Sequence, residues 1–410
     1  MLCAVSGARA DSLEWRTAFD WFASAQAIVP PGSPGNPGNR ILRIPLLTIE
    51  NEARPSLRFD YATFQLVVRP SFAAAVSTTR IDQAWQAPKL GIRADWADLY
   101  GAWRVTDSLS LSYGLQNYQW GPAETLSPSN PIFHQPYTRT ILTLIRGKHL
   151  VRANLSPSRS WSIVVVLEPR DNGEPAFVSG TAFDRKALVK LEYTRPSGDS
   201  YLGITAGKGE TSRGWVGEYG VLSLTDALSI YGDARHMMGS DVLYPTGILE
   251  PGRAFAATQA NSRAIQTIAV AGARYQFADG EDLRIEYLQN DPGYSSDQLA
   301  RSAQAAASLA AIDPSVVGAY ASPGLDIPGR MYLYASARAP KLGPHDHLSL
   351  SAQYLQSLTT RNAALIVNAE WIYDDALVFF ISAAAVPGPQ GEDLTRLTRG
   401  YWLMGSRFSR

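Results

Sequence analysis

The most constraining feature of this sequence is an alternation of apolar and polar residues that runs through segments of about ten residues. Successive side chains of a β-strand point to opposite faces, so a period of two predicts strands whose two faces meet different environments. In the first segment Leu13, Trp15 and Phe19 share one face, while Glu14 and Arg16 lie on the other. Helical periodicity is nearly absent, and the predicted fold class is therefore all-β.

The alternation and the turn residues between segments together predict about eighteen strands. Tight turns such as Thr106-Asp107 and Pro196-Ser-Gly-Asp199 alternate strictly with long loops such as 120–137 and 290–328. The strands are expected at 12–24, 41–51, 56–69, 91–105, 108–119, 138–155, 160–168, 186–195, 199–207, 214–225, 227–237, 263–277, 281–289, 329–339, 346–357, 361–373, 375–384 and 399–409.

An even number of antiparallel strands, with short turns at one end and long loops at the other, is typical of transmembrane β-barrels of the bacterial outer membrane. Closure is needed there, because an open sheet edge in lipid leaves backbone amides unpaired. We therefore expect a single barrel over residues 11–410, with its short turns and both termini in the periplasm. Outer-membrane lipid would surround it, and the barrel-assembly machinery would be a partner.

The composition agrees with a membrane wall. Charged residues make up 18% of the chain, whereas roughly a quarter of the residues in a soluble protein are charged. Basic and acidic residues number 37 each, so no basic field favours nucleic acid as a partner. No apolar run reaches the roughly 18 residues that a transmembrane helix needs. Aromatic residues that gather near predicted strand ends, as in an interfacial belt, are Trp15, Trp103, Tyr193, Tyr275, Tyr287, Tyr354 and Trp371.

Three other segments carry signals of their own. Residues 1–10 end in Ala8-Arg9-Ala10, the small-x-small form of a signal-peptidase site, and are expected to be the remnant of a cleaved signal peptide. The chain's last segment, in which Trp402 and Phe408 share a face, resembles the C-terminal strand of outer-membrane barrels. The alanine-rich stretch 296–321 has helical spacing and predicts a short helix within the loop at about 290–328.

Charged residues of the polar face are expected to line a water-filled lumen, because each would be costly on the lipid face. Both signs are interleaved, whereas a strongly ion-selective pore normally carries a ring of one sign. A neutral or sugar-like solute is therefore expected. The predicted lumen-lining residues are Glu14, Arg16, Asp20, Asp98, Arg104, Lys190, Glu192, Asp233, Arg235, Arg284, Glu286 and Glu370.

The segment 116–137 follows a clean strand and is dense in proline and aromatic residues. Flat aromatic faces beside amide and carboxylate groups are suited to stack on a sugar ring and to hydrogen-bond to it. The alternative interpretation is a constriction loop folded against the barrel wall. The expected ligand-binding residues are Gln116, Tyr118, Trp120, Glu124, Asn130, Phe133, His134 and Tyr137.

A family resemblance lies in the same segment. The run Tyr118-Gln-Trp-Gly-Pro122, followed by Glu124 and by Ser127-Pro-Ser-Asn-Pro131, resembles the strand-to-loop motif of large outer-membrane barrels that handle surface polysaccharide. Examples are the capsule-assembly (Wzi-like) and alginate-export families. The resemblance implies an eighteen-stranded barrel that passes or anchors a glycan, with periplasmic export partners in the case of an exporter.

No enzymatic activity, metal or cofactor is expected. The five histidines show no ligand spacing such as HExxH, and the nearest catalytic arrangement is His236 beside Asp233 and Ser240. The predicted function is an outer-membrane channel for neutral or sugar-like solutes, with exopolysaccharide export as one form of it. The alternatives are a non-conducting surface barrel that binds or anchors polysaccharide through its loops, and a sheath around an electron carrier.

Overall fold

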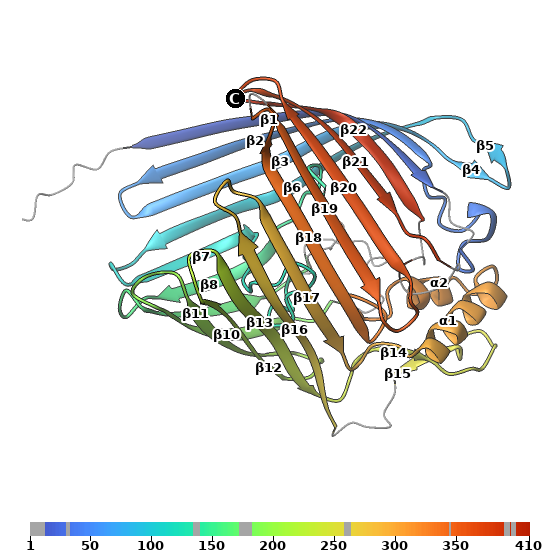
Figure 1. Ribbon diagram of the computed structural model, residues 1–410. Helices are drawn as coiled ribbons and strands as arrows, with labels where there is room; N and C mark the ends of the chain where they lie inside the picture. Colours follow the sequence, from blue (N-terminus) through green and yellow to red (C-terminus); the bar gives the residue numbers. More distant parts are fainter. Residues whose placement is uncertain are drawn as a thin grey trace, which may run out of the picture.

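The computed structural model describes residues 13–29, 33–133, 140–171, 183–257, 264–343, 346–388, 394 and 399–410, and within them the chain forms a closed antiparallel β-barrel (Figure 1). Eighteen strands pair edge to edge, and β1 pairs with both β2 and β22, so the sheet closes on itself. The predicted fold class is confirmed. The predicted signal-peptide remnant at residues 1–10 lies outside the described residues.

The barrel wall uses eighteen of the assigned strands. In chain order they are β1 (Glu14–Val29), β2 (Leu47–Tyr61), β3 (Phe64–Thr78), β6 (Lys89–Arg104), β7 (Leu109–Gln116), β8 (Lys148–Leu155), β9 (Trp161–Glu168), β10 (Lys186–Thr194), β11 (Tyr201–Gly209), β12 (Trp215–Ser223), β13 (Leu228–Met238), β16 (Ile265–Gln276), β17 (Asp282–Asn290), β18 (Met331–Leu342), β19 (Leu348–Ser357), β20 (Ala363–Ile372), β21 (Leu377–Ala385) and β22 (Gly400–Ser409).

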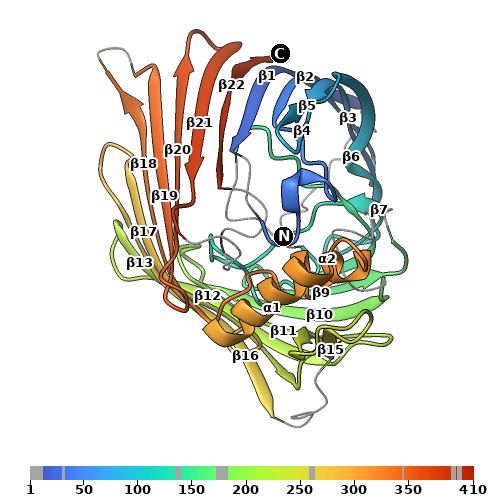
Figure 2. The ribbon, with the colours of Figure 1, turned by 90° about the vertical axis from the view of Figure 1, so that its right-hand side faces the viewer.

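Smaller elements lie in the connections. The hairpins are β4 (Arg80–Ile81) with β5 (Ala84–Trp85), and β14 (Leu243–Pro245) with β15 (Phe255–Ala257). Two helices, α1 (Ser296–Leu309) and α2 (Pro314–Ala321), occupy the connection in which one short helix is predicted. Figure 2 shows both helices at the end of the barrel opposite the short turns. No helix within the described ranges is both long and apolar enough to cross a membrane.

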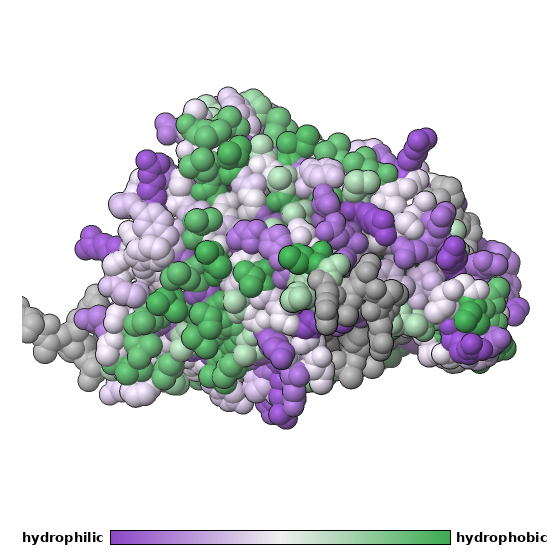
Figure 3. All heavy atoms as spheres, turned by 90° about the horizontal axis from the view of Figure 1, so that it is seen from below, coloured by the Kyte–Doolittle hydropathy of each residue, from purple (hydrophilic) through white to green (hydrophobic). Residues whose placement is uncertain are grey.

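The two faces of the wall differ as the alternation predicts. In β9, Val165 and Leu167 are 39% and 42% exposed on the outside, whereas Val164 and Val166 point inward and are buried. Seen from below, the wall carries apolar patches, and hydrophilic residues become denser toward the end with the helices, on the right (Figure 3). An apolar outer surface on a closed sheet is the architecture of outer-membrane barrels, which agrees with the predicted location.

Aromatic residues form a belt at the end of the barrel with the short turns. Trp15, Trp103, Tyr193, Tyr275 and Trp371 are each one residue from that end of their strand, and all five side chains are exposed on the outside. Tyr287 and Tyr354, which are also predicted for the belt, lie deeper in β17 and β19. Such a belt marks the boundary between water and the apolar membrane core.

The predicted boundaries are wrong around β2, β3 and β8. Strands expected at 41–51 and 56–69 are instead Leu47–Tyr61 and Phe64–Thr78. Pro55 does not end β2, because the strand pairs on both sides of it, from Ala53 with Phe72 to Leu57 with Val68. The turn lies at 62–63, where Ala62 has a φ of 49°. The strand expected at 138–155 begins only at Lys148.

The predicted strict alternation of tight and long connections is also wrong in two places. Connections at the end opposite the helices are all short, as expected. At the helical end, 210–214 and 358–362 are short as well, among long loops such as 239–264 and 291–330. The long loops therefore gather over part of the mouth and leave other parts of the rim bare.

Candidate functional site

Of the long connection between β7 and β8, the structure describes residues 117–133 and 140–147, and both parts fold into the barrel lumen. Trp120, Ile132 and Phe133 in this loop are 7%, 1% and 3% exposed. They pack against inward-facing side chains of β8, β9, β10 and β12, including Leu150 and Val166. The loop therefore lies against the inner wall. We call residues 117–133 and 140–147 the lumen loop.

The lumen loop also reaches the opposite side of the barrel. Leu126 is buried with inward-facing residues of β16 to β20, such as Val270 and Leu288. Farther along the loop, Ile141 and Leu142 pack beside Phe22 of β1. Contacts with three well-separated parts of the wall mean that the loop crosses the lumen and narrows it.

Glu286 of β17 fixes the middle of the lumen loop. Its carboxylate accepts backbone hydrogen bonds from Glu124 at 2.7 Å and Thr125 at 2.9 Å, and it also accepts the hydroxyl of Thr125. The hydroxyl of Tyr231 donates to the same carboxylate at 2.8 Å. Glu286 is 1% exposed. A buried carboxylate needs such donors, because burial without them is costly.

Asp233 of β13 holds the next part of the loop. Its carboxylate accepts the backbone amide of Ser129 at 2.8 Å and the hydroxyl of Ser127 at 2.6 Å. Gly121 is essential to this approach, because its φ is +93° and a Cβ there would lie 2.2 Å from the Asp233 carboxylate. Only a residue without a side chain fits at that position.

Two further contacts fix the ends of the lumen loop. The backbone amide of Asn117 donates to Asp98 of β6 at 2.9 Å, next to an Arg69–Asp98 ion pair of 3.2 Å. Near the other end, the guanidinium of Arg54 donates to the carbonyl of Leu142 at 2.6 Å. Charged groups of the inner wall thus bind the backbone of the loop from its start almost to its finish.

The charged residues of the inner wall occur largely in pairs of opposite sign. Most of these pairs join neighbouring strands or alternate residues of one strand, and Arg93–Glu50 reaches across β3 from β6 to β2. The pairs are Arg16–Glu14, Arg54–Glu52, Arg58–Asp60, Arg93–Glu50, Lys190–Glu192, Arg274–Asp282 and Arg284–Asp282. Such pairing offers hydrogen-bonding groups to a solute without a field of one sign.

A cavity of about 620 Å³ lies between the lumen loop and the helical end of the barrel. Leu126 and Pro131 of the loop line it, together with residues from the outer ends of the strands. Basic Lys148 and Arg213 and acidic Glu168 are among its polar residues. These three residues could not be identified from the sequence, because they stand at strand ends or in a short connection where the alternation gives no signal.

The structure places the predicted lumen residues on the inward face of their strands. Lys190, Asp233 and Glu286 are buried beneath the lumen loop, while Arg104 lies exposed near the end with the short turns. Glu370 is partly buried in β20, on the same face as the inward-pointing Ile366.

The predicted ligand-binding residues of the loop are mostly packed away. Gln116 is buried and donates to the carbonyl of Leu150 at 2.9 Å, and Asn130 is buried as well. The faces of Trp120 and Phe133 lie against the wall, so neither ring is open to a sugar. The arrangement is that of the alternative interpretation, the constriction loop.

Two of the eight predicted loop residues, Tyr118 and Glu124, differ from this pattern, and two others lie outside the described residues. Tyr118 is partly buried, with the guanidinium carbon of Arg152 4.4 Å from its ring centroid. Glu124 accepts the hydroxyl of Ser336 at 2.8 Å and lies 3.8 Å from the guanidinium of Arg284. Predicted residues that lie outside the described residues are His134 and Tyr137.

The arrangement of His236 with Asp233 and Ser240, suggested as a catalytic possibility, is not formed. Asp233 points inward to the lumen loop, whereas His236 lies on the outward face of β13. There Nε2 of His236 is 2.9 Å from Oε1 of Glu218, and Nδ1 is 2.9 Å from the hydroxyl of Thr267. In the ranges that the structure describes, no three histidine, cysteine, aspartate or glutamate residues group to hold a metal ion.

Solved structures with the same architecture include three from bacterial outer membranes. OccAB1 of Acinetobacter baumannii is 10% identical, with a TM-score of 0.59 over 97% of this chain and 96% of that chain. OccK7 (OpdD) of Pseudomonas aeruginosa is 12% identical, with a TM-score of 0.55 over 97% and 99%. The outer membrane protein OprD of Pseudomonas aeruginosa is 10% identical, with a TM-score of 0.53 over 96% and 94%.

No protein-family model and no curated protein matches the sequence. The resemblance to capsule-assembly and alginate-export families is thus not shown by these comparisons. At 9–12% identity, the likeness to the Occ and OprD barrels concerns the fold. The chain has the fold of an eighteen-stranded outer-membrane barrel, matched along almost its whole length.

Proposed function

We propose that this protein is an outer-membrane channel for small polar solutes, with the lumen loop as its constriction. The observation that carries the proposal is the course of residues 117–133, which enter the lumen and are held there by the carboxylates of Glu286 and Asp233. Of the solutes expected from the sequence, net-neutral and sugar-like ones fit best, because the charges of the inner wall are paired.

The same loop argues against export of a polysaccharide chain. A polymer needs a continuous wide passage, and the lumen loop contacts β1, β8 to β10, β12 and β16 to β20 inside the barrel. Trp120 and Phe133 would have to leave buried positions before either could stack on a glycan. Both considerations favour small solutes over a polysaccharide as the cargo.

Reconstitution tests the proposal directly. Single-channel conductance in planar bilayers and swelling of proteoliposomes in a pentose, a hexose and a disaccharide would be measured for two proteins. One is the natural chain, and the other has residues 121–133 replaced by a short glycine-serine linker. We expect the natural chain to pass the smaller sugars slowly, and the variant to conduct several-fold more and to admit the disaccharide.

A matched control shortens the β4–β5 hairpin, residues 80–85, which projects from the outer end of the wall in Figure 1. This change should leave conductance unaltered. If neither the natural chain nor the 121–133 variant conducted ions or passed sugars, the channel proposal would be abandoned. A non-conducting barrel that binds polysaccharide at its surface would then be the better account.

A further inference from the structure

A groove of about 790 Å³ runs along the membrane-facing side of the wall over β11, β12 and β13. Leu202, Leu222 and Ile230, which belong to the outward-facing positions of these strands, line it and are 58%, 47% and 42% exposed. Gly220 and Gly232 lie between these larger side chains and form part of the lining. The part of the groove that faces the membrane is therefore apolar.

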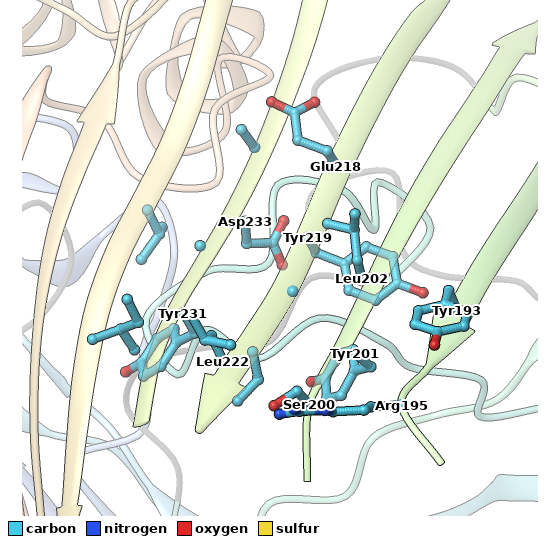
Figure 4. A pocket seen from close by; sticks show the side chains of 16 residues that line it. Tyr193, Arg195, Ser200, Tyr201, Leu202, Glu218, Tyr219, Leu222, Tyr231 and Asp233 are labelled. Carbon is cyan, nitrogen blue, oxygen red and sulfur yellow. The ribbon is translucent and has the colours of Figure 1, made fainter. Parts of the chain in front are cut away.

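The two ends of the groove are polar in different ways. At the end with the short turns, Arg195 and Ser200 lie together, as Figure 4 shows, and the Arg195 side chain is exposed. At the opposite end is Glu218, whose carboxylate is 2.9 Å from His236. The Glu218 carboxylate has a hydrogen-bonding partner in His236, whereas Arg195 stands beside Asp199 in the turn 195–200, at the level of the aromatic belt.

The length of the apolar part is close to the depth of one membrane leaflet. From Leu222 to Glu218 is four residues of β12, which corresponds to about 13 Å along the strand at the usual rise and to about 10 Å along the membrane normal at the usual tilt of barrel strands. The apolar band of an outer-membrane barrel is about 25 Å tall. The groove thus extends from the boundary at the short turns to about the middle of the membrane.

We propose that this groove binds one phospholipid of the periplasmic leaflet, with its phosphate at Arg195 and one acyl chain along Leu202, Leu222 and Ile230. A basic group at the water boundary followed by an apolar groove of one leaflet's depth is complementary to an anionic headgroup and its chain. The proposal rests on the outer-membrane location and is independent of what passes through the lumen.

A second groove on the same surface provides a comparison within the molecule. It measures about 500 Å³ and is lined by outward-facing residues of β16 to β20 such as Leu283, Ile285 and Tyr354. Its two arginines, Arg274 and Arg284, are on inward-facing positions and pair with Asp282. Without a basic group facing the membrane, this groove should take acyl chains without preference for a headgroup.

Native mass spectrometry of the full chain tests the proposal. The protein would be stripped of lipid in detergent and titrated with phosphatidylglycerol. We expect one lipid to be retained tightly, and Arg195→Ala to weaken its binding about tenfold, the equivalent of one charge-assisted hydrogen bond. Gly232→Leu should weaken binding similarly by filling the groove, since a Cβ at Gly232 meets nothing closer than 3.8 Å and the barrel can accommodate it.

Two matched variants control for general effects. Arg159→Ala removes a cation from a neighbouring short turn, and Ala369→Leu adds bulk to an outward position of β20, far from the groove. Both should bind phosphatidylglycerol as the natural chain does. Equal binding by Arg195→Ala and the natural chain would overturn the proposal, and so would equal losses in the controls. Effective competition by glycerol phosphate would show a free-phosphate site and would also overturn the lipid assignment.

Discussion

Acidic residues on the inner and outer faces of the barrel wall accept hydrogen bonds from different kinds of donor. Inside the barrel, Asp233 and Glu286 are 2% and 1% exposed and accept hydrogen bonds from the backbone of the lumen loop. Outside, the Glu218 side chain is 48% exposed, and its acceptor function is met by His236 on the adjacent strand. The inner acids organise a long segment of chain, and the outer acid joins two neighbouring strands.

The inner and outer acids also differ in how far along the sequence their partners lie. Glu218 and His236 are 18 residues apart and are brought together by one strand pairing. Glu286 and Glu124 are 162 residues apart, and Asp233 and Ser129 are 104 apart. Loss of an inner acid should therefore release a distant loop, while loss of the outer acid should have only a local effect.

The largest effect is expected from Glu286→Ala. This change leaves the buried amides of Glu124 and Thr125 and the hydroxyl of Tyr231 without their acceptor. We expect the free energy of unfolding to fall by about 3–5 kcal/mol and the conductance to rise as the loop loosens. Urea unfolding in vesicles and planar-bilayer recordings would measure the two effects.

Glu286→Gln is the matched control, since it keeps one acceptor oxygen at the same place. It should lose less stability than Glu286→Ala and show a smaller rise in conductance. If both variants conducted like the natural chain, Glu286 would not hold the constriction. The inner acids would then have no more influence on conductance than the outer acid.

Gly121→Ala is expected to have the next largest effect. A methyl group there would lie 2.2 Å from the Asp233 carboxylate, at a backbone φ of +93° that residues with a side chain rarely adopt. The loop would have to withdraw from Asp233, at a cost of about 2 kcal/mol. Gly198→Ala is a suitable control, because it shares a positive φ of +79° but has no neighbour within 4 Å. Gly121→Ala alone should then alter conductance.

The barrel could be predicted from the sequence because each strand records its two surroundings locally. In β7, Leu111 and Tyr113 face the membrane while Ser112 between them faces the lumen, and no distant information is needed to recognise this alternation. The error at β2 and β3 has a local cause as well. Pro55 and Pro70 look like strand ends, but each lies within a strand that continues past it.

The path of the lumen loop could not be predicted in the same way. Its proline and aromatic residues fit both a surface loop and a buried one, and the choice depends on Asp233 and Glu286 across the lumen. These two acids are identified from the sequence as lumen residues, but their partners are not. Likewise, Glu218 could not be predicted as a wall residue with a partner, because apolar residues are expected at the outward positions of a membrane barrel.

Glu218→Gln should change stability much less than the inner substitutions. The hydrogen bond between His236 and the carboxylate is weakened, but the cost of keeping a carboxylate on a face that meets the membrane is removed, and these contributions oppose each other. We expect the free energy of unfolding to change by less than about 1 kcal/mol and conductance to stay the same. A change in conductance comparable with that of Glu286→Ala would break the distinction between the two faces.

The smallest effect concerns Asp184, an acid of the outer rim that belongs to neither face. Burial alone would raise the pKa of its carboxyl, but hydrogen bonds from Ser212 and Thr211 outweigh this and lower the pKa from 3.8 to about 2. Because the folded-state pKa is lowered, the stabilisation is present above pH 4 and is lost as the pH falls toward 2.

Asp184→Asn should therefore reduce the free energy of unfolding near neutral pH by less than about 0.5 kcal/mol, since solvent screens this partly exposed carboxylate. The difference from the natural chain should vanish near pH 2. Unfolding curves at several pH values would measure this, with Asp107→Asn, in an exposed short turn, as the control. If the difference in free energy of unfolding between Asp184→Asn and the natural chain grew as the pH fell, the lowered pKa of Asp184 would be contradicted. The hydrogen bonds of this rim acid would then not stabilise the fold, in contrast to those of the acids beneath the lumen loop.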